Sequence, residues 1–104
     1  MDFKDLASGL GLDEGDVKEL VELFVTTTLS DIDKIKKGVR ENNSLDAAAA
    51  AHSIKGASGN LGFDDISGLT RDMEMQAKKG NLDNFEKYIK DLENRMDTIK
   101  NALV

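Results

Sequence analysis

The sequence predicts an all-α protein, an up-down four-helix bundle with a short additional N-terminal helix. The chain of 104 residues has no proline, and aromatic residues make up only 5% of it. Apolar residues recur at intervals of three and four along five segments, and no segment shows the alternation of a strand. Since this length is typical of one compact unit, we expect residues 1–104 to form a single helical bundle domain.

Glycines, in the absence of proline, separate the predicted helices. The first covers residues 2–10, is ended by Gly9 and Gly11, and places three apolar residues at helical spacing: Phe3, Leu6 and Leu10. The second follows a cap at Asp13 or Asp16 and extends to about Asn42. Its inward stripe is expected to comprise Val17, Leu20, Val21, Phe24, Leu29, Ile32, Ile35 and Val39.

The third helix is predicted to be capped by Ser44 and to run to about Leu61, with small residues facing inward: Ala47, Ala51, Ile54, Ser58 and Leu61. The fourth begins near Phe63 and ends before Gly80, with an inward stripe of Ile66, Leu69, Met73 and Ala77. The fifth follows a cap at Asn81 and uses Leu82, Phe85, Ile89, Leu92, Met96, Ile99 and Leu103.

Composition and charge exclude several classes of protein. Fourteen basic residues against 20 acidic ones give a formal charge of −6, which argues against nucleic acid and anionic membrane surfaces as partners. With no cysteine, the chain has no disulfide and no thiolate chemistry. The longest apolar run is Ala47–Ala51, and the acidic start of the chain does not resemble a signal peptide, so we expect a cytoplasmic protein.

The reactive side chains are few, and His52 is the only histidine. No HExxH or EF-hand spacing is present, and a histidine-based metal site would need carboxylates for all its other ligands, so we expect no metal site. No GxxxxGK[ST] loop or GxGxxG motif supports nucleotide binding, and no strand-to-helix turn presents a nucleophilic serine. Any side-chain chemistry is therefore expected to run through His52.

His52 lies one position beyond the inward-facing Ala51, at the edge of its helix. Lys55, Gly56 and Gly59 follow at i+3, i+4 and i+7 on the same face. Each glycine costs roughly 1 kcal/mol relative to alanine inside a helix, and what it provides here is space around the imidazole. An exposed neutral imidazole beside a lysine is able to accept a phosphoryl group. The alternative is a half-buried packing histidine beside an ordinary solvated lysine.

The segment from His52 to Gly62, H-S-I-K-G-A-S-G-N-L-G, resembles the signature H-x-[LI]-K-G-x-[SA]-x-x-[LVI]-G of histidine-containing phosphotransfer (HPt) domains. The resemblance implies a four-helix bundle that shuttles phosphoryl groups in two-component phosphorelays. His52 would carry the group on Nε2 and exchange it with an aspartate of a response-regulator receiver domain. Lys55 would support the phosphoryl charge, and Gly56 would keep the imidazole accessible. Glu74, where the family often has Glu or Gln, would orient the imidazole by a hydrogen bond.

Alternatives remain open for the residues near this motif. Glu74 lies among other charged residues, so a surface charge competes with the orienting role. Ser58 is expected to bond the carbonyl four residues earlier rather than a phosphate. Of Met73 and Met75, only one can face the core, and Tyr88 is expected to close the bundle.

The implied partners are receiver domains and a hybrid sensor kinase, with the protein itself a monomer. It would have no kinase activity and no cofactor, while Mg²⁺ would be bound by the receiver. The docking face is expected around His52, Lys55, Gly56 and Gly59, together with apolar neighbours from the second helix. Two other readings compete: a receiver-binding adaptor that transfers nothing, and a phosphoacceptor domain excised from a larger sensor kinase.

Overall fold

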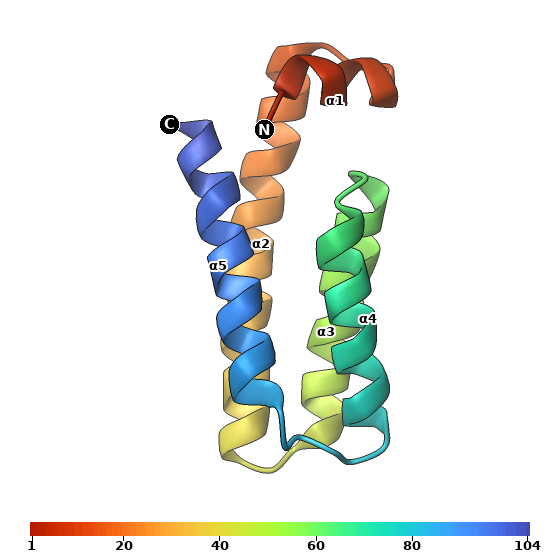
Figure 1. Ribbon diagram of the computed structural model, residues 1–104, viewed down its shortest axis with the longest axis vertical. Helices are drawn as coiled ribbons and strands as arrows, with labels where there is room; N and C mark the ends of the chain where they lie inside the picture. The colour runs from red at the N-terminus through yellow and green to blue at the C-terminus, as the bar shows by residue number, and fades with distance from the viewer.

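The computed structural model describes residues 1–104 and contains four long helices and a shorter one. The long helices lie antiparallel, and the short one lies across their end (Figure 1). Successive long helices run in opposite directions, so the up-down topology predicted from the sequence is confirmed. No strand is present, and none of the five helices is both long and apolar enough to cross a bilayer. The helices are α1 (Phe3–Leu10), α2 (Glu14–Arg40), α3 (Ser44–Asn60), α4 (Asp64–Lys78) and α5 (Phe85–Leu103).

Helix α1 lies across the end of the bundle at which α2 begins (Figure 1). The Asp2 side chain caps it by accepting hydrogen bonds from the backbone N–H groups of Lys4 and Asp5. Gly11 ends it with a φ of 69°, a left-handed conformation that favours glycine. The helix buries Phe3 and Ala7, and this anchors it to the bundle.

The start of α3 differs from the prediction by one residue. Asn43, not Ser44, is the cap, and its Oδ1 atom accepts a hydrogen bond from the N–H of Asp46 at 3.2 Å. Ser44 is the first residue inside the helix. Asn42, with a φ of 53°, turns the chain just before the cap. The side chain of Asn43 is therefore the one that reaches the free N–H groups at the start of the helix.

The start of α5 also differs from the prediction, and here the helix begins later than the sequence indicates. Helix α5 begins at Phe85, and Asn84 precedes it. The Asn81 side chain accepts a hydrogen bond from the N–H of Asp83 at 3.0 Å, which stabilises a turn and keeps residues 81–84 out of the helix. Leu82 nevertheless packs against the core from this turn.

The core lies between all five helices, and most of the predicted inward residues are in it. The others are partly buried and pack against the core, except for Leu20, which is 40% exposed. Val25, Thr28 and Gly38 are buried although the predicted stripe omitted them, because α2 packs against α1, α3 and α5 and therefore buries a wider face than one stripe. Met73 is fully buried and Met75 is 50% exposed, as the spacing required.

Gly38 allows α2 and the start of α3 to approach closely. A Cβ atom at this position would lie 2.9 Å from the carbonyl oxygen of Asn43 and 3.1 Å from the backbone nitrogen of Ala47. The N–H of Asn43 also donates to the carbonyl of Gly38 at 2.7 Å. The tight turn between α2 and α3, which sets how α3 lies on α2, therefore depends on a glycine here.

Candidate functional site

His52 stands on the surface of α3, where its side chain is 65% exposed. Ala51 and Ile54, on either side of it in sequence, are fully buried and fix this turn of α3 to the core. The imidazole is therefore held at the edge of the helix by backbone that is itself well packed. The alternative of a half-buried packing histidine is wrong.

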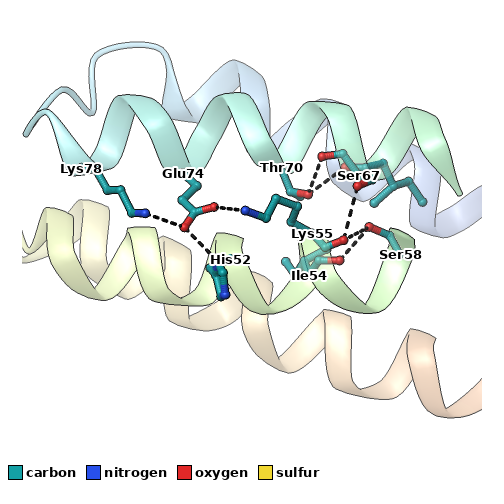
Figure 2. A network of polar contacts seen from close by, with 9 residues as sticks. His52, Ile54, Lys55, Ser58, Ser67, Thr70, Glu74 and Lys78 are labelled. Carbon is teal, nitrogen blue, oxygen red and sulfur yellow. Dashed lines mark hydrogen bonds and ion pairs between the residues drawn. The ribbon is translucent and has the colours of Figure 1, made fainter. Parts of the chain in front are cut away.

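Glu74 of α4 is the hub of the site, and Figure 2 shows three side chains converging on its carboxylate. The Nδ1 atom of His52 lies 2.9 Å from Oε2, and the Nζ atom of Lys55 donates to Oε1 at 2.7 Å. The Nζ atom of Lys78 lies 3.0 Å from Oε2. The Glu74 side chain is only 6% exposed, so it is not the surface charge that the sequence left open.

These contacts keep Glu74 ionised. The hydrogen bond from Lys55 does most to lower the pKa of Glu74 to about 2, and bonds from Lys78 and His52 act in the same direction against the opposing effect of burial. An ionised carboxylate only accepts hydrogen bonds, so the bond to His52 assigns the proton of the neutral imidazole to Nδ1. The lone pair of that ring is then on Nε2, the other nitrogen.

Lys55 is tied to the site rather than solvated. Its side chain is 31% exposed, and its ammonium group lies against Glu74 Oε1. The structure thus brings together His52, Lys55 and Glu74 from two helices, three of the residues that the sequence singled out. Lys55 and His52 occupy different oxygens of the same carboxylate.

Gly56 and Gly59 differ in their surroundings. A Cβ atom at Gly56 would meet no atom within 4 Å, so nothing in the packing requires a glycine there. A Cβ atom at Gly59 would lie 3.5 Å from the Oγ atom of Ser67, on the side that faces α4. Gly56 therefore leaves open space one turn from His52, whereas Gly59 adjoins the neighbouring helix.

Three hydroxyl groups donate hydrogen bonds to backbone carbonyls beside the site, and one of these bonds joins α4 to α3 (Figure 2). The Ser58 hydroxyl donates to the carbonyl of Ile54 at 2.7 Å, as expected from the sequence. The Ser67 hydroxyl of α4 donates to the carbonyl of Lys55 at 3.3 Å, and the Thr70 hydroxyl donates within α4. The bond from Ser67, which sequence reasoning missed, links α4 to the turn of α3 that carries Lys55.

Lys78 is the other residue that sequence reasoning missed. The sequence does contain a pattern that indicates this contact. Glu74 and Lys78 are four residues apart on a predicted helix, which is the spacing at which opposite charges pair. No group of three or more His, Cys, Asp or Glu side chains is arranged to hold a metal ion. The arrangement is that of an exposed nitrogen nucleophile with a fixed ring and two nearby cations.

An apolar groove lies between α2 and α3, and Ala57, the residue after Gly56, is one of the residues that line it. We call it the α2–α3 groove, and part of α1 also borders it. Leu20 and Leu23 are 40% and 60% exposed within it, which explains why Leu20 does not belong to the core. The groove is lined by Leu10, Leu12, Leu20, Leu23, Phe24, Thr27, Ala57, Asn60 and Leu61.

Comparisons with known proteins agree with this geometry. A family model described as the Hpt domain matches residues 19–102. The phosphorelay intermediate protein YPD1 of Candida albicans is 30% identical over 90 residues, which are 86% of this chain and 48% of that protein. The chain thus spans about half the length of this curated relative. The crystal structure of histidine-containing phosphotransfer protein B (HptB) from Pseudomonas aeruginosa PAO1 superposes with a TM-score of 0.85 and 22% identity, covering 99% of this chain and 90% of that one.

Proposed function

This chain belongs to the Hpt domain family, and on that premise we propose that it is a phosphorelay intermediate of two-component signalling that carries a phosphoryl group on His52. One observation carries the proposal. The Nδ1 atom of His52 is bound to a buried carboxylate while the side chain as a whole is 65% exposed, which leaves Nε2 free to react.

In the proposed step, the lone pair of Nε2 attacks the phosphorus of an aspartyl phosphate on a receiver domain. The new N–P bond forms as the P–O bond to the aspartate breaks, and the aspartate leaves as a carboxylate. The ring keeps its Nδ1 proton and becomes a phosphorylated cation, which the Glu74 carboxylate at 2.9 Å stabilises. The reverse step returns the group to a receiver aspartate.

Lys55 and Gly56 would assist this step in different ways. A flexible lysine side chain that is 31% exposed can turn from Glu74 toward a phosphoryl group on the same helix face and offset its charge. The open space at Gly56 would admit the receiver to within reacting distance of His52. Gly59, which adjoins Ser67, would contribute the rim of the docking surface rather than the approach to the imidazole.

The α2–α3 groove is the surface on which we place the receiver. Ala57 and Asn60, which follow Gly56 on α3, line this groove, and Leu20 and Leu23 are exposed leucines in it. An apolar surface of this kind beside a reactive group is typical of a recognition site. The docking face then includes the apolar contribution from the second helix that the sequence predicted.

The partner would supply the rest of the chemistry. The receiver would hold Mg²⁺ and its acidic pocket, and a hybrid sensor kinase would supply phosphoryl groups at the start of the relay. This chain would have no kinase activity of its own, and it would act as a monomer in the cytoplasm. A receiver-binding adaptor that transfers nothing, and an acceptor domain within a larger kinase, are the competing possibilities.

The test is an incubation of the protein with a receiver domain labelled as its aspartyl phosphate. We expect the label to move to this chain, to be stable in base and labile in acid, as an N–P bond is, and to be absent from His52→Gln. The variant should keep its helical circular dichroism, because the imidazole is exposed. Label that persists in His52→Gln would refute the assignment, and a receiver that binds without transferring label would favour the adaptor.

A further inference from the structure

Lys78 is the partner of Glu74 to which the proposed function gives no role. Its Nζ atom lies 3.0 Å from Oε2, the oxygen that also faces Nδ1 of His52 at 2.9 Å. The two side chains meet at this one atom from opposite sides in Figure 2. Lys78 is 64% exposed and projects from α4 one turn beyond Glu74, so it is not needed to fill the core.

We propose that Lys78 is a positioning residue of the site, which offsets the charge of Glu74 and thereby keeps the imidazole of His52 neutral and nucleophilic near pH 7. The inference rests on the proposed function only where it concerns the rate of phosphotransfer. Its effect on the imidazole can be measured without any transfer.

The argument begins with the charge of Glu74. A buried carboxylate in contact with an imidazole favours the protonated ring, which has no lone pair on Nε2 and cannot attack phosphorus. Lys55 of α3 and Lys78 of α4 place two positive charges on the same carboxylate, so the cluster with a neutral ring carries a net charge of +1. A further proton on the ring would raise this to +2, which the two ammonium groups oppose.

No other charged side chain takes part in the cluster. The remaining ion pairs of the protein lie within α2, within α5, or between α5 and either α2 or α4, and none of them includes a residue of the cluster. The charged groups joined to the imidazole by ion pairs are therefore Glu74, which contacts it directly, and Lys55 and Lys78, which contact Glu74.

Lys55 and Lys78 pair with different oxygens of the Glu74 carboxylate. Lys55 occupies Oε1 and is the residue that we expect to turn toward a phosphoryl group, after which it no longer neutralises Glu74. Lys78 shares Oε2 with the Nδ1 side of the ring, on which no phosphoryl group is expected. It can therefore stay in place throughout the transfer.

The test uses the fact that His52 is the only histidine, so its ring nuclei give the only imidazole signals in an NMR titration of the intact chain. In Lys78→Gln we expect the ring to bind its proton about two to three times more tightly than in the wild type, a displacement of roughly 0.3–0.5 pH unit. Lys78→Arg should restore the wild-type curve. Lys79→Gln removes the same charge from the adjacent residue, which forms no ion pair with Glu74, and should leave the curve in place.

A double-variant comparison tests whether Lys78 acts through Glu74. In a Glu74→Gln background the ammonium group loses its anchor, so Lys78→Gln should displace the titration by less than half as much as in the wild type. The acid limb of the transfer rate against pH should move with the NMR curve in the single variant. A Lys78→Gln curve that matches Lys79→Gln, or an equal displacement in the Glu74→Gln background, would overturn the inference. If the NMR displacement occurs but the wild-type protein accepts no phosphoryl group, the electrostatic role stands and the proposed function fails.

Discussion

The Nδ1 atom of His52 and the Oε2 atom of Glu74 lie 2.9 Å apart although 22 residues separate them in the sequence. The exposed member of this pair would react, and the buried member fixes which nitrogen is free to do so. The same carboxylate also pairs with two lysines, so its ionisation is expected to affect both the stability of the protein and the imidazole of His52.

The first prediction concerns the dependence of stability on pH. The folded pKa of Glu74, about 2, lies below the ordinary 4.5, so its ionisation stabilises the fold fully above about pH 4.5, and this contribution is lost as the pH falls toward 2. Glu74→Gln should therefore cost about 1–3 kcal/mol of unfolding free energy at pH 7, given that its partner Lys78 is largely exposed. Urea unfolding measured at several pH values checks this. Equal losses in the wild type and the variant between pH 5 and 2 would contradict it.

The second prediction tests the role of Gly56. A methyl group there meets nothing, so Gly56→Ala should raise the unfolding free energy by up to about 1 kcal/mol and slow transfer little. Gly56→Gln should fold equally well but transfer on the order of a hundredfold more slowly, because a long side chain at i+4 points back toward His52 and displaces the partner. Melting temperature and single-turnover transfer are measured on the same samples. A folded Gly56→Gln protein with the wild-type rate would show that the glycine does not protect access.

Gly38 provides the third prediction, with Gly56 as its matched control. Both are glycines inside long helices, but a Cβ atom at Gly38 would lie 2.9 Å from the backbone oxygen of Asn43. We expect Gly38→Ala to lower the unfolding free energy by about 1–3 kcal/mol, since the connection between α2 and α3 must shift to admit it. Denaturant midpoints of the two alanine variants should therefore move in opposite directions. A Gly38→Ala protein that is more stable than the wild type would show that the connection between α2 and α3 can shift without loss of unfolding free energy.

The fourth prediction compares two exposed leucines. Leu23 is 60% exposed in the α2–α3 groove, and Leu45 is 72% exposed near the start of α3, at the far end of the bundle. Leu23→Ser should weaken receiver binding about tenfold, because burying a leucine contributes on the order of 1.5 kcal/mol or more. Leu45→Ser should leave the dissociation constant unchanged. The two constants are measured by calorimetry, and equal effects would place the docking surface elsewhere.

The sequence alone was sufficient for the class of fold and for the exposed position of His52, the residue that we propose to react. The spacing of apolar residues predicted all five helices, because a helix repeats every 3.6 residues and its buried face follows from that period alone. The same period placed His52 at the edge of α3, beside the buried Ala51. The predicted helix ends were less accurate, because local hydrogen bonds decide them. The Asn43 side chain, not Ser44, caps α3, and a turn held by the Asn81 side chain delays the start of α5.

The tertiary structure decided which residues meet. The period of α4 indicates its inner face, but not that Glu74 lies opposite His52, because that depends on how α4 is placed along α3 by the packing of the whole core. For the same reason the sequence did not show that Lys55 points at Glu74 or that Leu20 borders a groove. A helical period acts within one segment of the chain, whereas a contact between helices reflects the sum of many packing interactions across them.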